Sequence, residues 1–320
     1  MKEIEVIVTS VTPLAAGISA WEFRHPDGAE LPPFTAGAHI DLLLPNGLRR
    51  SYSLCNNQDD RDRYVVAVSL DPASTGGSRF IHESLKPGDR LPIHPPINNF
   101  ALNESAPHTV FFAGGIGITP IWSMIQRMES LGRSWELHYS TRQREVCAFK
   151  ALLEDIEQKE PGRVHFNFDQ ELGGRMLDLK ALIAASPEDA HLYCCGPKLM
   201  LDAFLSAAAF GERPQDHVHV EYFSPAHEAA REGGFVVELA RSGGTYEIPE
   251  GVSILEVLLE EGIDLPFSCM EGTCGTCSVE VLEGVPDHRD SVLTPDERAT
   301  NKRMMICCSG SKSAKLVLDT

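Results

Sequence analysis

The spacing of four cysteines near the C-terminus is the feature that most constrains this chain. Cys269, Cys274 and Cys277 form the pattern C-x4-C-x2-C, and Cys307 follows thirty positions after the third. Four thiolates at this spacing typically hold the two irons of a [2Fe–2S] cluster. The residues between them include glycines, which let backbone N–H groups turn toward the sulfurs. The pattern therefore predicts one-electron chemistry.

Three other interpretations of the cysteines are weaker. Cys274 and Cys277 alone form a C-x-x-C motif, but Cys269 and Cys307 argue against a thioredoxin-like pair. A structural zinc site usually takes two close pairs rather than three cysteines and one. Disulfides are disfavoured because the N-terminus lacks a signal-peptide core, which indicates a reducing setting. Either Cys307 or its neighbour Cys308 could supply the fourth thiolate.

Composition narrows the class of protein. The 320 residues suffice for two or three domains, and the 42% that are hydrophobic can give each domain a core. No apolar run reaches the roughly 18–20 residues that cross a bilayer, so we expect a cytoplasmic protein with no membrane partner. The net charge of −18 argues against nucleic acid as a partner. An acidic face could steer a basic redox partner, although solubility explains most of such a charge.

The first hundred residues contain short strand-like segments separated by turn residues. These segments are Ile4–Val8, Ser19–Phe23, His39–Leu44, Arg50–Leu54 and Tyr64–Ser69. Because no long helical pattern interrupts them, we expect an antiparallel β-barrel in residues 1–103.

Residues 104–223 alternate between strand and helix. The expected strands are Thr109–Ala113, Trp135–Ser140, Val164–Phe168 and His191–Cys195. The expected helices are Pro120–Leu131, Cys147–Lys159, Leu177–Ala185 and Pro197–Ala209. This alternation predicts an α/β domain with a parallel sheet.

A polar, turn-rich stretch at residues 224–233 reads as a linker to a third domain, residues 234–320. This domain carries the four cysteines. Its expected elements are the strands Phe235–Leu239, Thr245–Ile248, Ser278–Leu282 and Lys315–Leu318 and the helix Ile254–Glu261. The mixture predicts an α+β fold, so the chain as a whole is expected to be multidomain.

Two motifs in the first domain could hold a phosphate. Arg50, Ser51, Tyr52 and Ser53 share one expected strand, on which an Arg and hydroxyls can bind an anion and Tyr52 offers a flat face to an aromatic ring. The glycine-rich turn Thr75–Arg79 precedes a helical segment and exposes N–H groups to an anion. Each motif alone also fits an ordinary barrel wall.

Glycine turns follow two strands of the second domain. Phe111–Pro120 runs from a strand through Gly-Gly-Ile-Gly-Ile-Thr-Pro into a helix, a geometry that accepts a pyrophosphate on backbone amides. Thr-Pro stands where G-x-G-x-x-G has its third glycine, and a turn without a ligand is the alternative. Tyr193–Pro197 repeats the strand and glycine turn, so both turns are expected to line one crevice.

Together, the Arg-x-Tyr-Ser strand, the Gly-Gly-x-Gly-x-Thr-Pro turn and the Cys-Gly-Pro turn resemble those of the ferredoxin–NADP reductase superfamily. With a plant-type ferredoxin domain at the C-terminus, the order of domains is similar to that of the phthalate dioxygenase reductase family. This resemblance covers essentially the whole chain. It implies a flavin-binding barrel, a nucleotide domain, a β-grasp cluster domain and the cofactors FMN, NADH and [2Fe–2S].

The resemblance also implies roles for individual residues. The FMN site would comprise Arg50, Ser51, Tyr52, Ser53, Gly77, Ser78, Arg79 and Phe223. Phe223 would stack on the flavin ring, and a core phenylalanine is the alternative. The NADH site would comprise Gly115, Gly117, Thr119, Ser140, Arg142, Cys195, Gly196 and Pro197, with Cys195 near the nicotinamide. The metal ligands would be Cys269, Cys274, Cys277 and Cys307. No catalytic acid or base is expected, and His288 is expected to be structural.

The implied function is an electron-transfer reductase. Electrons would pass from NADH through FMN and the cluster to a Rieske-type oxygenase, and the protein would be a monomer. A P450 or a ferredoxin as acceptor, or a redox sensor that turns nothing over, are the alternatives. Arg142 could pair with the 2′-phosphate of NADPH, but the family habit favours NADH.

Overall fold

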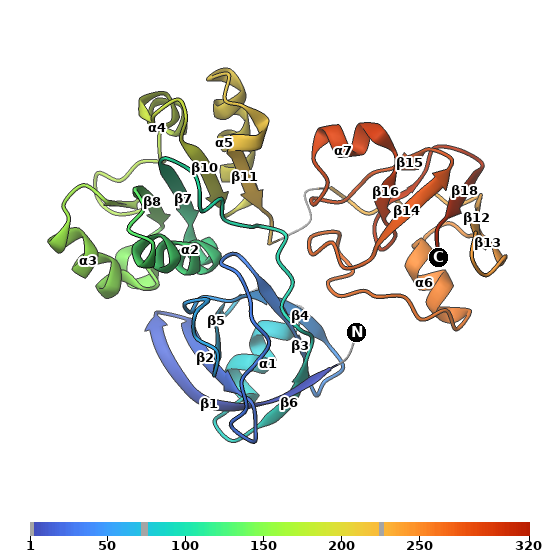
Figure 1. Cartoon of the computed structure of the whole chain (residues 1–320), viewed down its shortest axis with the longest axis horizontal. Coiled ribbons are helices and arrows are strands. Elements are labelled where there is room, and N and C mark those ends of the chain that lie inside the picture. The colour runs from blue at the N-terminus through green and yellow to red at the C-terminus, as the bar shows by residue number, and fades with distance from the viewer. Residues whose placement is uncertain (1–2, 72–75, 224–226) are drawn as a thin grey trace. The chain divides into compact units, whose positions relative to one another are not determined.

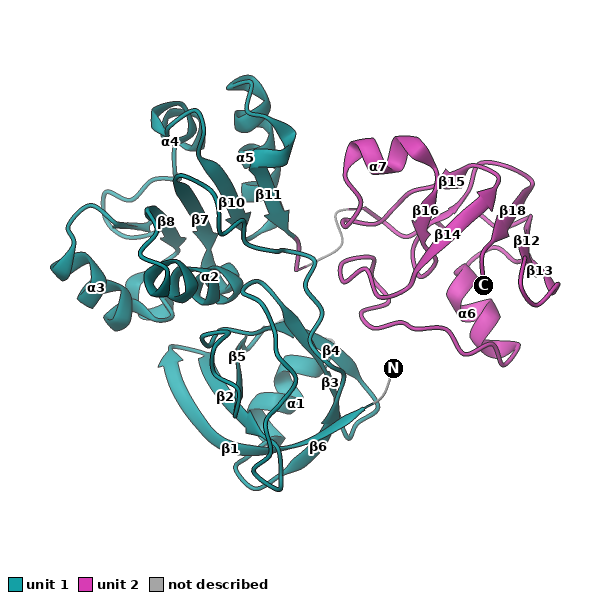
Figure 2. Cartoon of the chain, viewed as in Figure 1, with its two compact units in different colours: residues 1–221 teal, residues 222–320 magenta. Residues whose placement is uncertain are grey.

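The computed structural model describes residues 3–71, 76–223 and 227–320. The chain forms two compact units, Met1–Glu221 and Tyr222–Thr320, which Figure 2 distinguishes by colour. The first unit contains an antiparallel and a parallel sheet, and the second contains a further five-stranded sheet and a two-stranded pair (Figure 1). Within the described residues, every helix is too short or too polar to cross a bilayer.

The first sheet is antiparallel, with the strand order β4-β3-β6-β1-β2-β5. Its elements are β1 (Ile4–Ala15), β2 (Ile18–Arg24), β3 (His39–Leu43), β4 (Arg49–Ser53), β5 (Tyr64–Ser69), α1 (Gly77–Ser84) and β6 (Arg90–Ile93). A bridge between Leu54 and Val66 links the end of β4 to β5, so the sheet curls on itself. Trp21, Phe23 and Ile40 fill its interior. The expected antiparallel barrel is confirmed.

The second sheet is parallel, with the order β11-β10-β7-β8-β9. Its strands are β7 (Thr109–Gly114), β8 (Trp135–Thr141), β9 (Val164–Phe168), β10 (His191–Cys195) and β11 (Val218–Glu221). Helices α2 (Ile118–Ser130) and α3 (Lys150–Lys159) lie on one side, and α4 (Leu179–Ala185) and α5 (Lys198–Phe210) on the other (Figure 1). The short 3-10 segments are η1 (Gly115–Gly117), η2 (Arg144–Val146) and η3 (Gln215–His217). The expected parallel α/β fold is confirmed.

The four helices of this sheet differ at their starts from the sequence expectation. Helix α4 begins at Leu179 rather than Leu177, because the Asp178 side chain caps it, and α5 begins at Lys198 rather than Pro197. Helix α2 begins at Ile118, two residues before Pro120, because proline is tolerated in the first turn of a helix. Helix α3 begins at Lys150 rather than Cys147, because Phe149 adopts the left-handed conformation with a φ of 57°. A helix cannot run through such a residue.

The second unit contains a five-stranded sheet in the order β13-β12-β18-β14-β16 and the pair β15-β17. Its elements are β12 (Phe235–Leu239), β13 (Thr245–Ile248), α6 (Ile254–Glu260), β14 (Ser278–Glu283), β15 (Pro286–Asp287), α7 (Pro295–Thr300), β16 (Arg303–Met305), β17 (Gly310–Ser311) and β18 (Lys315–Leu318). Strands β12 and β18 pair in parallel at the centre, and β13 and β14 flank them antiparallel. The expected α+β cluster domain is confirmed.

The segment before β12 is bonded to the second unit. The Ala230 amide donates to the carbonyl of Cys308 at 2.7 Å, and the Arg231 carbonyl accepts from Gly251 at 2.8 Å. Ala230 is also buried. These residues fall in the stretch 224–233 expected to be a linker, of which 224–226 lie outside the described residues. The part near β12 therefore belongs structurally to the cluster domain.

Candidate functional site

The Arg50 side chain lies across Gly77 at the start of α1. A Cβ on Gly77 would come within 2.8 Å of Arg50 Cγ and Nε, so only glycine leaves room for the guanidinium here. The Arg50 Nη1 also donates to the carbonyl of Arg49 at 2.8 Å. A helix N-terminus and a guanidinium both attract phosphate. The structure thus places Arg50 against Gly77, and Ser78 and Arg79 follow in the first turn of α1, whereas Thr75 of the predicted turn lies outside the described residues.

Asp41 holds strand β4 from inside the sheet. Its Oδ1 accepts from Ser51 Oγ at 2.7 Å, and its Oδ2 lies 3.1 Å from His94 Nδ1. Both Asp41 and His94 are buried, so this bonding fixes one side of the strand that carries the predicted flavin residues. Burial raises the pKa of Tyr52 to about 12, although the Arg50 charge lowers it in part. The Tyr52 phenol is therefore neutral at physiological pH.

The two glycine turns pack backbone against backbone. A Cβ on Gly117 would come within 2.2 Å of the Cys195 carbonyl oxygen, and one on Gly196 within 3.0 Å of Gly114 Cα. Gly115 has a φ of +55° and nothing within 4 Å of its missing Cβ. The carboxyl ends of β7 and β10 thus approach more closely than side chains would allow. This is the position where open parallel sheets bind ligands.

The other predicted nucleotide residues lie close to these turns. Thr119 is buried and its hydroxyl donates to the Ile116 carbonyl at 3.0 Å, which stabilises the first turn. Ser140 Oγ accepts from Asn167 Nδ2 at 3.0 Å at the end of β8. Arg142 is exposed just beyond that strand. Pro197 directly precedes α5. Thr119 and Ser140 therefore support the backbone, while Arg142 faces solvent.

Glu221 is a site residue to which the sequence pattern assigned no role. It pairs with Cys195 in the register of β10 and β11, and its Oε2 lies 3.9 Å from Cys195 Sγ. The Ser53 hydroxyl also hydrogen-bonds this carboxyl. Burial raises the pKa of Glu221 to about 8, although the bonds from Cys195 and Ser53 lower it in part. The signal in the sequence was a carboxylate one strand away from the Cys-Gly-Pro turn.

The bond network connects the two predicted cofactor sites of the first unit. Ser53 belongs to the expected flavin strand, and Cys195 to the expected nicotinamide turn. Burial, together with the Glu221 carboxylate, raises the pKa of Cys195 well above that of an ordinary thiol. Cys195 is fully buried and un-ionised, so it is no nucleophile here.

Phe223 stands at the start of the second unit, just after β11. Its side chain is 41% exposed, which excludes the alternative that it is a core residue. An exposed aromatic side chain is available to stack on a ring. Its contact with a flavin stays a prediction.

The four predicted metal ligands gather in one loop region of the second unit. Cys307 interacts with both Cys269 and Cys277, and Cys269 also with Cys274. Backbone amides point at the sulfurs: Glu271 N and Thr273 N lie 3.3 and 3.4 Å from Cys269 Sγ. Hydrogen bonds from the Cys274 and Cys307 thiols and from Thr273 and the Glu271 amide lower the pKa of Cys269. The contacts favour the thiolate at Cys269, whereas the neighbouring thiols raise the pKa of Cys274 and Cys307.

The geometry distinguishes Cys307 from Cys308. Cys307 takes part in the sulfur group, whereas Cys308 Sγ lies 3.8 Å from the Met305 carbonyl and 3.9 Å from Ser309 Oγ. Cys308 Sγ also lies close to Gly272, where an added Cβ would come within 2.4 Å of this sulfur. Cys308 therefore packs behind the cysteine loop, and Cys307 is the better candidate for the fourth ligand.

Asp290 supports the cysteine loop from behind. Its Oδ1 accepts from the amides of Val292 and Leu293 at 3.0 and 2.7 Å. The amide of Ser291, the residue after Asp290, donates to the Gly272 carbonyl at 2.8 Å. Asp290 is fully buried, and His288 Nδ1 lies 3.9 Å from its Oδ2. His288 thus sits among buried structural groups, in keeping with the role expected for it.

The residues present fit the implied cofactors. Four thiols with amides directed at sulfur are the donor set of a [2Fe–2S] cluster. The Arg50 guanidinium over Gly77 offers charge and N–H groups to one phosphate. The crowded turns at Gly117 and Gly196 leave backbone, rather than side chains, to meet a dinucleotide.

Two family models match this chain. The 2Fe-2S iron-sulfur cluster binding domain matches residues 237–311, and the oxidoreductase NAD-binding domain matches residues 111–205. These matches contain the four predicted cluster ligands and the Gly115, Gly117 and Cys195 turns. Neither model covers the antiparallel barrel.

Curated relatives match nearly the whole chain. Tetrachlorobenzoquinone reductase of Sphingobium chlorophenolicum is 50% identical over 99% of this chain and 98% of the relative. Vanillate O-demethylase oxidoreductase of a Pseudomonas species is 41% identical over 99% of both chains. Phthalate dioxygenase reductase of Burkholderia cepacia is 40% identical over 98% of this chain and 96% of the relative.

Two solved structures also match nearly the whole of this chain. The structure of phthalate dioxygenase reductase has a TM-score of 0.73 and 39% identity, covering 99% of this chain and 98% of that one. An intact type IV self-sufficient cytochrome P450 monooxygenase gives a TM-score of 0.88 at 38% identity over 99% of this chain. This chain spans only 41% of that P450. The likeness in that case concerns one part of a longer protein.

Proposed function

Because the chain belongs to the phthalate dioxygenase reductase family, we propose that it is the reductase component of a Rieske-type oxygenase system. It is an iron–sulfur flavoprotein oxidoreductase whose cofactors are FMN, a [2Fe–2S] cluster and NADH. When bound, these cofactors supply hydride acceptance and one-electron transfer. One observation carries the proposal: four converging cysteines and two packed glycine turns occur in a chain that matches oxygenase reductases along its length.

In this proposal the first sheet holds the flavin. Arg50, Gly77, Ser78 and Arg79 bind its phosphate, and strand β4 offers Ser51, Tyr52 and Ser53 to the rest of the molecule. Asp41 keeps Ser51 in place through the 2.7 Å bond. Phe223 is the proposed residue that stacks on the flavin ring. Apart from Phe223, these residues belong to a flavin domain at residues 1–103.

The nucleotide domain, residues 104–223, holds NADH. Backbone groups of Gly115 and Gly117 meet the pyrophosphate, and Thr119 and Ser140 keep the ends of β7 and β8 in shape. Cys195, Gly196 and Pro197 line the nicotinamide, where the buried Cys195 thiol excludes water. Arg142 stands where the adenosine ribose would bind.

The cluster domain, residues 234–320, ligates iron through Cys269, Cys274, Cys277 and Cys307. Residues 224–233 connect it to the nucleotide domain. The proposed protein is a cytoplasmic monomer that meets its oxygenase transiently. The small, amide-rich loop around Cys269 leaves this cysteine only partly buried, whereas the other three proposed ligands are buried.

The test is anaerobic reduction of a purified Rieske-type oxygenase by the cofactor-loaded protein and NADH. We expect the oxygenase cluster to bleach and to give its reduced electron paramagnetic resonance signal at catalytic amounts of this protein. A C307S variant, which should load flavin but not the cluster, is the matched control. Reduction of the oxygenase by that variant at the wild-type rate, or no reduction by the wild type, would refute the proposal.

A quinone is a second candidate acceptor, because a 50% identical relative is named for tetrachlorobenzoquinone reduction. This relative matches 99% of the present chain, so the likeness includes all of its domains. Rates with tetrachlorobenzoquinone and with a Rieske-type oxygenase, compared at equal NADH, separate the two. A quinone rate that survives in C307S would assign that activity to the flavin domain alone. A P450 acceptor rests on the likeness to the self-sufficient enzyme and is tested in the same assay.

A further inference from the structure

Glu136, His138 and His165 form a group of potential metal ligands away from both glycine turns. One ligand atom from each residue lies within 4.8 Å of the other two. Glu136 and His138 stand two residues apart on β8, so they share one face of the sheet. His165 stands opposite His138 on the neighbouring strand β9. The sheet register, and no sequence motif, brings the three together.

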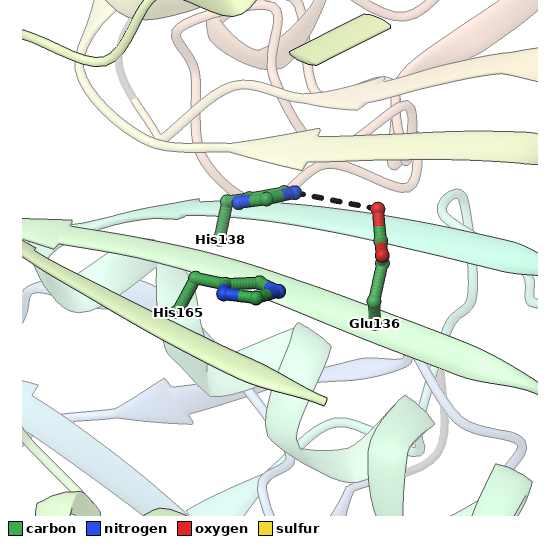
Figure 3. A group of neighbouring side chains, drawn as sticks. All are labelled: Glu136, His138 and His165. Carbon is green, nitrogen blue, oxygen red and sulfur yellow. Dashed lines mark hydrogen bonds and ion pairs between the residues drawn. The ribbon is translucent and has the colours of Figure 1, made fainter. Parts of the chain in front are cut away.

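Ring packing holds the His138 imidazole in place. His138 stacks on Phe112 at 5.2 Å on one side and on His165 at 4.8 Å on the other. The rings of His138 and His165 differ in tilt by 17°. Figure 3 shows these rings one over the other, with the Glu136 carboxylate beside their edges. His138 is therefore preorganised, and only His165 has freedom to move.

The carboxylate is ready to meet a cation. Glu136 Oε1 lies 3.3 Å from His138 Nε2, so the carboxylate already faces the imidazole edge. His108 is engaged with Ser134 Oγ at 2.7 Å. The Glu136 side chain is 29% exposed and His165 is exposed, so a hydrated ion can reach the group from solvent.

Two imidazoles and one carboxylate suit zinc and its neighbours better than magnesium or calcium, which prefer oxygen alone. Ligand bonds of about 2.1 Å in a tetrahedral site place donor atoms about 3.4 Å apart. To reach that spacing, the exposed His165 ring would have to turn out of its stack on His138, so that the lone pairs of the two rings converge. The cation replaces the hydrogen bond between His138 and Glu136, and His138 then carries its proton on Nδ1.

We propose that Glu136, His138 and His165 bind one divalent cation of the zinc class, which cross-links β8 to the edge strand β9. The site lies toward the amino ends of these strands, whereas the nucleotide turns follow the carboxyl ends of β7 and β10. It therefore stabilises the sheet edge without touching the hydride-transfer site. An edge strand gains most from such a link, since it is paired on one side alone.

A second imidazole group, His191, His217 and His219, provides the internal comparison. There His191 Nδ1 already bonds His219 Nε2 at 2.9 Å, and Asn103 lies 3.2 Å from the other His191 nitrogen. Burial lowers the pKa of His219 to about 4, so this ring is neutral. The group has no carboxylate ligand in it, and one nitrogen each of His191 and His219 is used in their mutual bond, whereas the buried His217 Nδ1 has no hydrogen-bond partner. It is expected to bind no cation.

The test is calorimetric titration of ZnCl2 into the cofactor-loaded protein after chelator treatment and gel filtration. The variants are His165→Ala and Glu136→Gln, with His217→Ala as the matched control. NADH–ferricyanide activity serves as the measure of folding, because none of these residues belongs to the cofactor sites. His138→Ala is omitted because that ring is packed in the sheet.

We expect one Zn²⁺ per chain in the wild type and in His217→Ala. Affinity should fall more than about tenfold in His165→Ala and in Glu136→Gln, as happens when ligand shells are disturbed. Zn²⁺ should also raise the melting temperature of the wild type and leave that of His165→Ala unchanged. Absence of Zn²⁺ binding in the wild type, undiminished binding in His165→Ala, or loss of binding in His217→Ala would overturn the proposal.

Discussion

Gly117 lies directly against the carbonyl of Cys195, so that a Cβ on Gly117 would come within 2.2 Å of the Cys195 oxygen. A helix start and a strand end thus meet through backbone atoms alone, at the point where two parallel strands stop. The atom that would clash belongs to backbone and cannot rotate away. The close approach of the two turns therefore requires glycine, which has no Cβ, at position 117.

The first prediction concerns this contact. Gly117→Ala should lower the free energy of unfolding by about 1–3 kcal/mol, because overpacking against fixed backbone strains both turns. It should also raise the KM for NADH at least several-fold. Steady-state kinetics and urea unfolding measure the two effects. Gly211→Ala is the control, since its Cβ would meet atoms no nearer than 3.5 Å. Equal effects of both substitutions would contradict the account of the crevice.

The second prediction separates the adjacent cysteines. Cys307→Ser should abolish the cluster, because Cys307 interacts with both Cys269 and Cys277. Cys308→Ser should retain the cluster, because that thiol packs against Gly272 and the Met305 carbonyl. Iron and acid-labile sulfide per chain, together with visible absorbance, measure the outcome. A Cys308→Ser variant without iron beside a loaded Cys307→Ser variant would reverse the assignment.

The third prediction uses Arg50. Arg50→Ala should weaken FMN binding at least about tenfold, since a charge-assisted bond to phosphate is worth roughly 1.5–3 kcal/mol. Fluorescence titration of the flavin-free protein measures the affinity. Arg90→Ala is the matched control, because Arg90 lies in the same sheet but pairs with Glu5 at 3.4 Å on the surface. The assignment fails if the two variants bind FMN alike.

The fourth prediction concerns pH. The pKa of Glu221 is raised from 4.5 to about 8, so the folded chain holds this proton more tightly than the unfolded chain between those values. The stability that protonation provides is complete below about pH 4.5 and is lost as the pH rises through about 8. Glu221→Gln removes this loss, so its stability relative to the wild type should grow by up to about 3 kcal/mol from pH 5 to pH 8.5.

Thermal and urea unfolding of both proteins at the two pH values check this difference. The direction is the informative part, because a carboxylate stabilised by ionisation would give the opposite slope. A wild type that becomes more stable than Glu221→Gln as the pH rises would show that Glu221 is ionised in the folded chain. The hydrogen bonds from Ser53 and Cys195 would then outweigh its burial.

The fifth prediction concerns coenzyme choice. Arg142 is exposed beyond β8, where the adenosine ribose is proposed to bind, so it can pair with a 2′-phosphate. Arg142→Ala should therefore reduce kcat/KM for NADPH about tenfold or more and leave the value for NADH nearly unchanged. Arg144 is a control of equal charge, since it is held by Glu171 at 2.7 Å. A loss with NADH as large as that with NADPH would refute this role.

The sequence predicted the three main sheets and their fold classes, because the local residue pattern and the tertiary structure agree in these parts of the chain. Strands β5, β9, β10, β12, β13 and β18 begin and end at the expected residues. The alternation of apolar residues and the glycine turns are local signals, and three of the four spaced cysteines also lie close together in the sequence. The fold class therefore follows from short-range patterns in the chain.

Elements that depend on distant partners were missed. Strand β6 is four residues long, includes Pro92, and exists because β1 pairs with it. Strand β11 likewise forms beside β10, which positions Glu221. Helix α7 could have been found, because Thr294 and Glu297 form a capping box around Pro295. The zinc-class group had no local signal, because 27 residues separate His138 from His165 and register alone joins them.

The most direct test of the central claim is anaerobic NADH titration of the purified, cofactor-loaded protein, followed by absorbance and electron paramagnetic resonance. The account predicts FMN with about two irons and two sulfides per chain, both chromophores bleached by NADH, and the signal of a reduced [2Fe–2S] cluster. In Cys307→Ser, NADH should bleach the flavin alone. Iron without flavin, or a cluster that stays oxidised while NADH is in excess, would contradict the assignment of this chain as an NADH-dependent electron-transfer reductase.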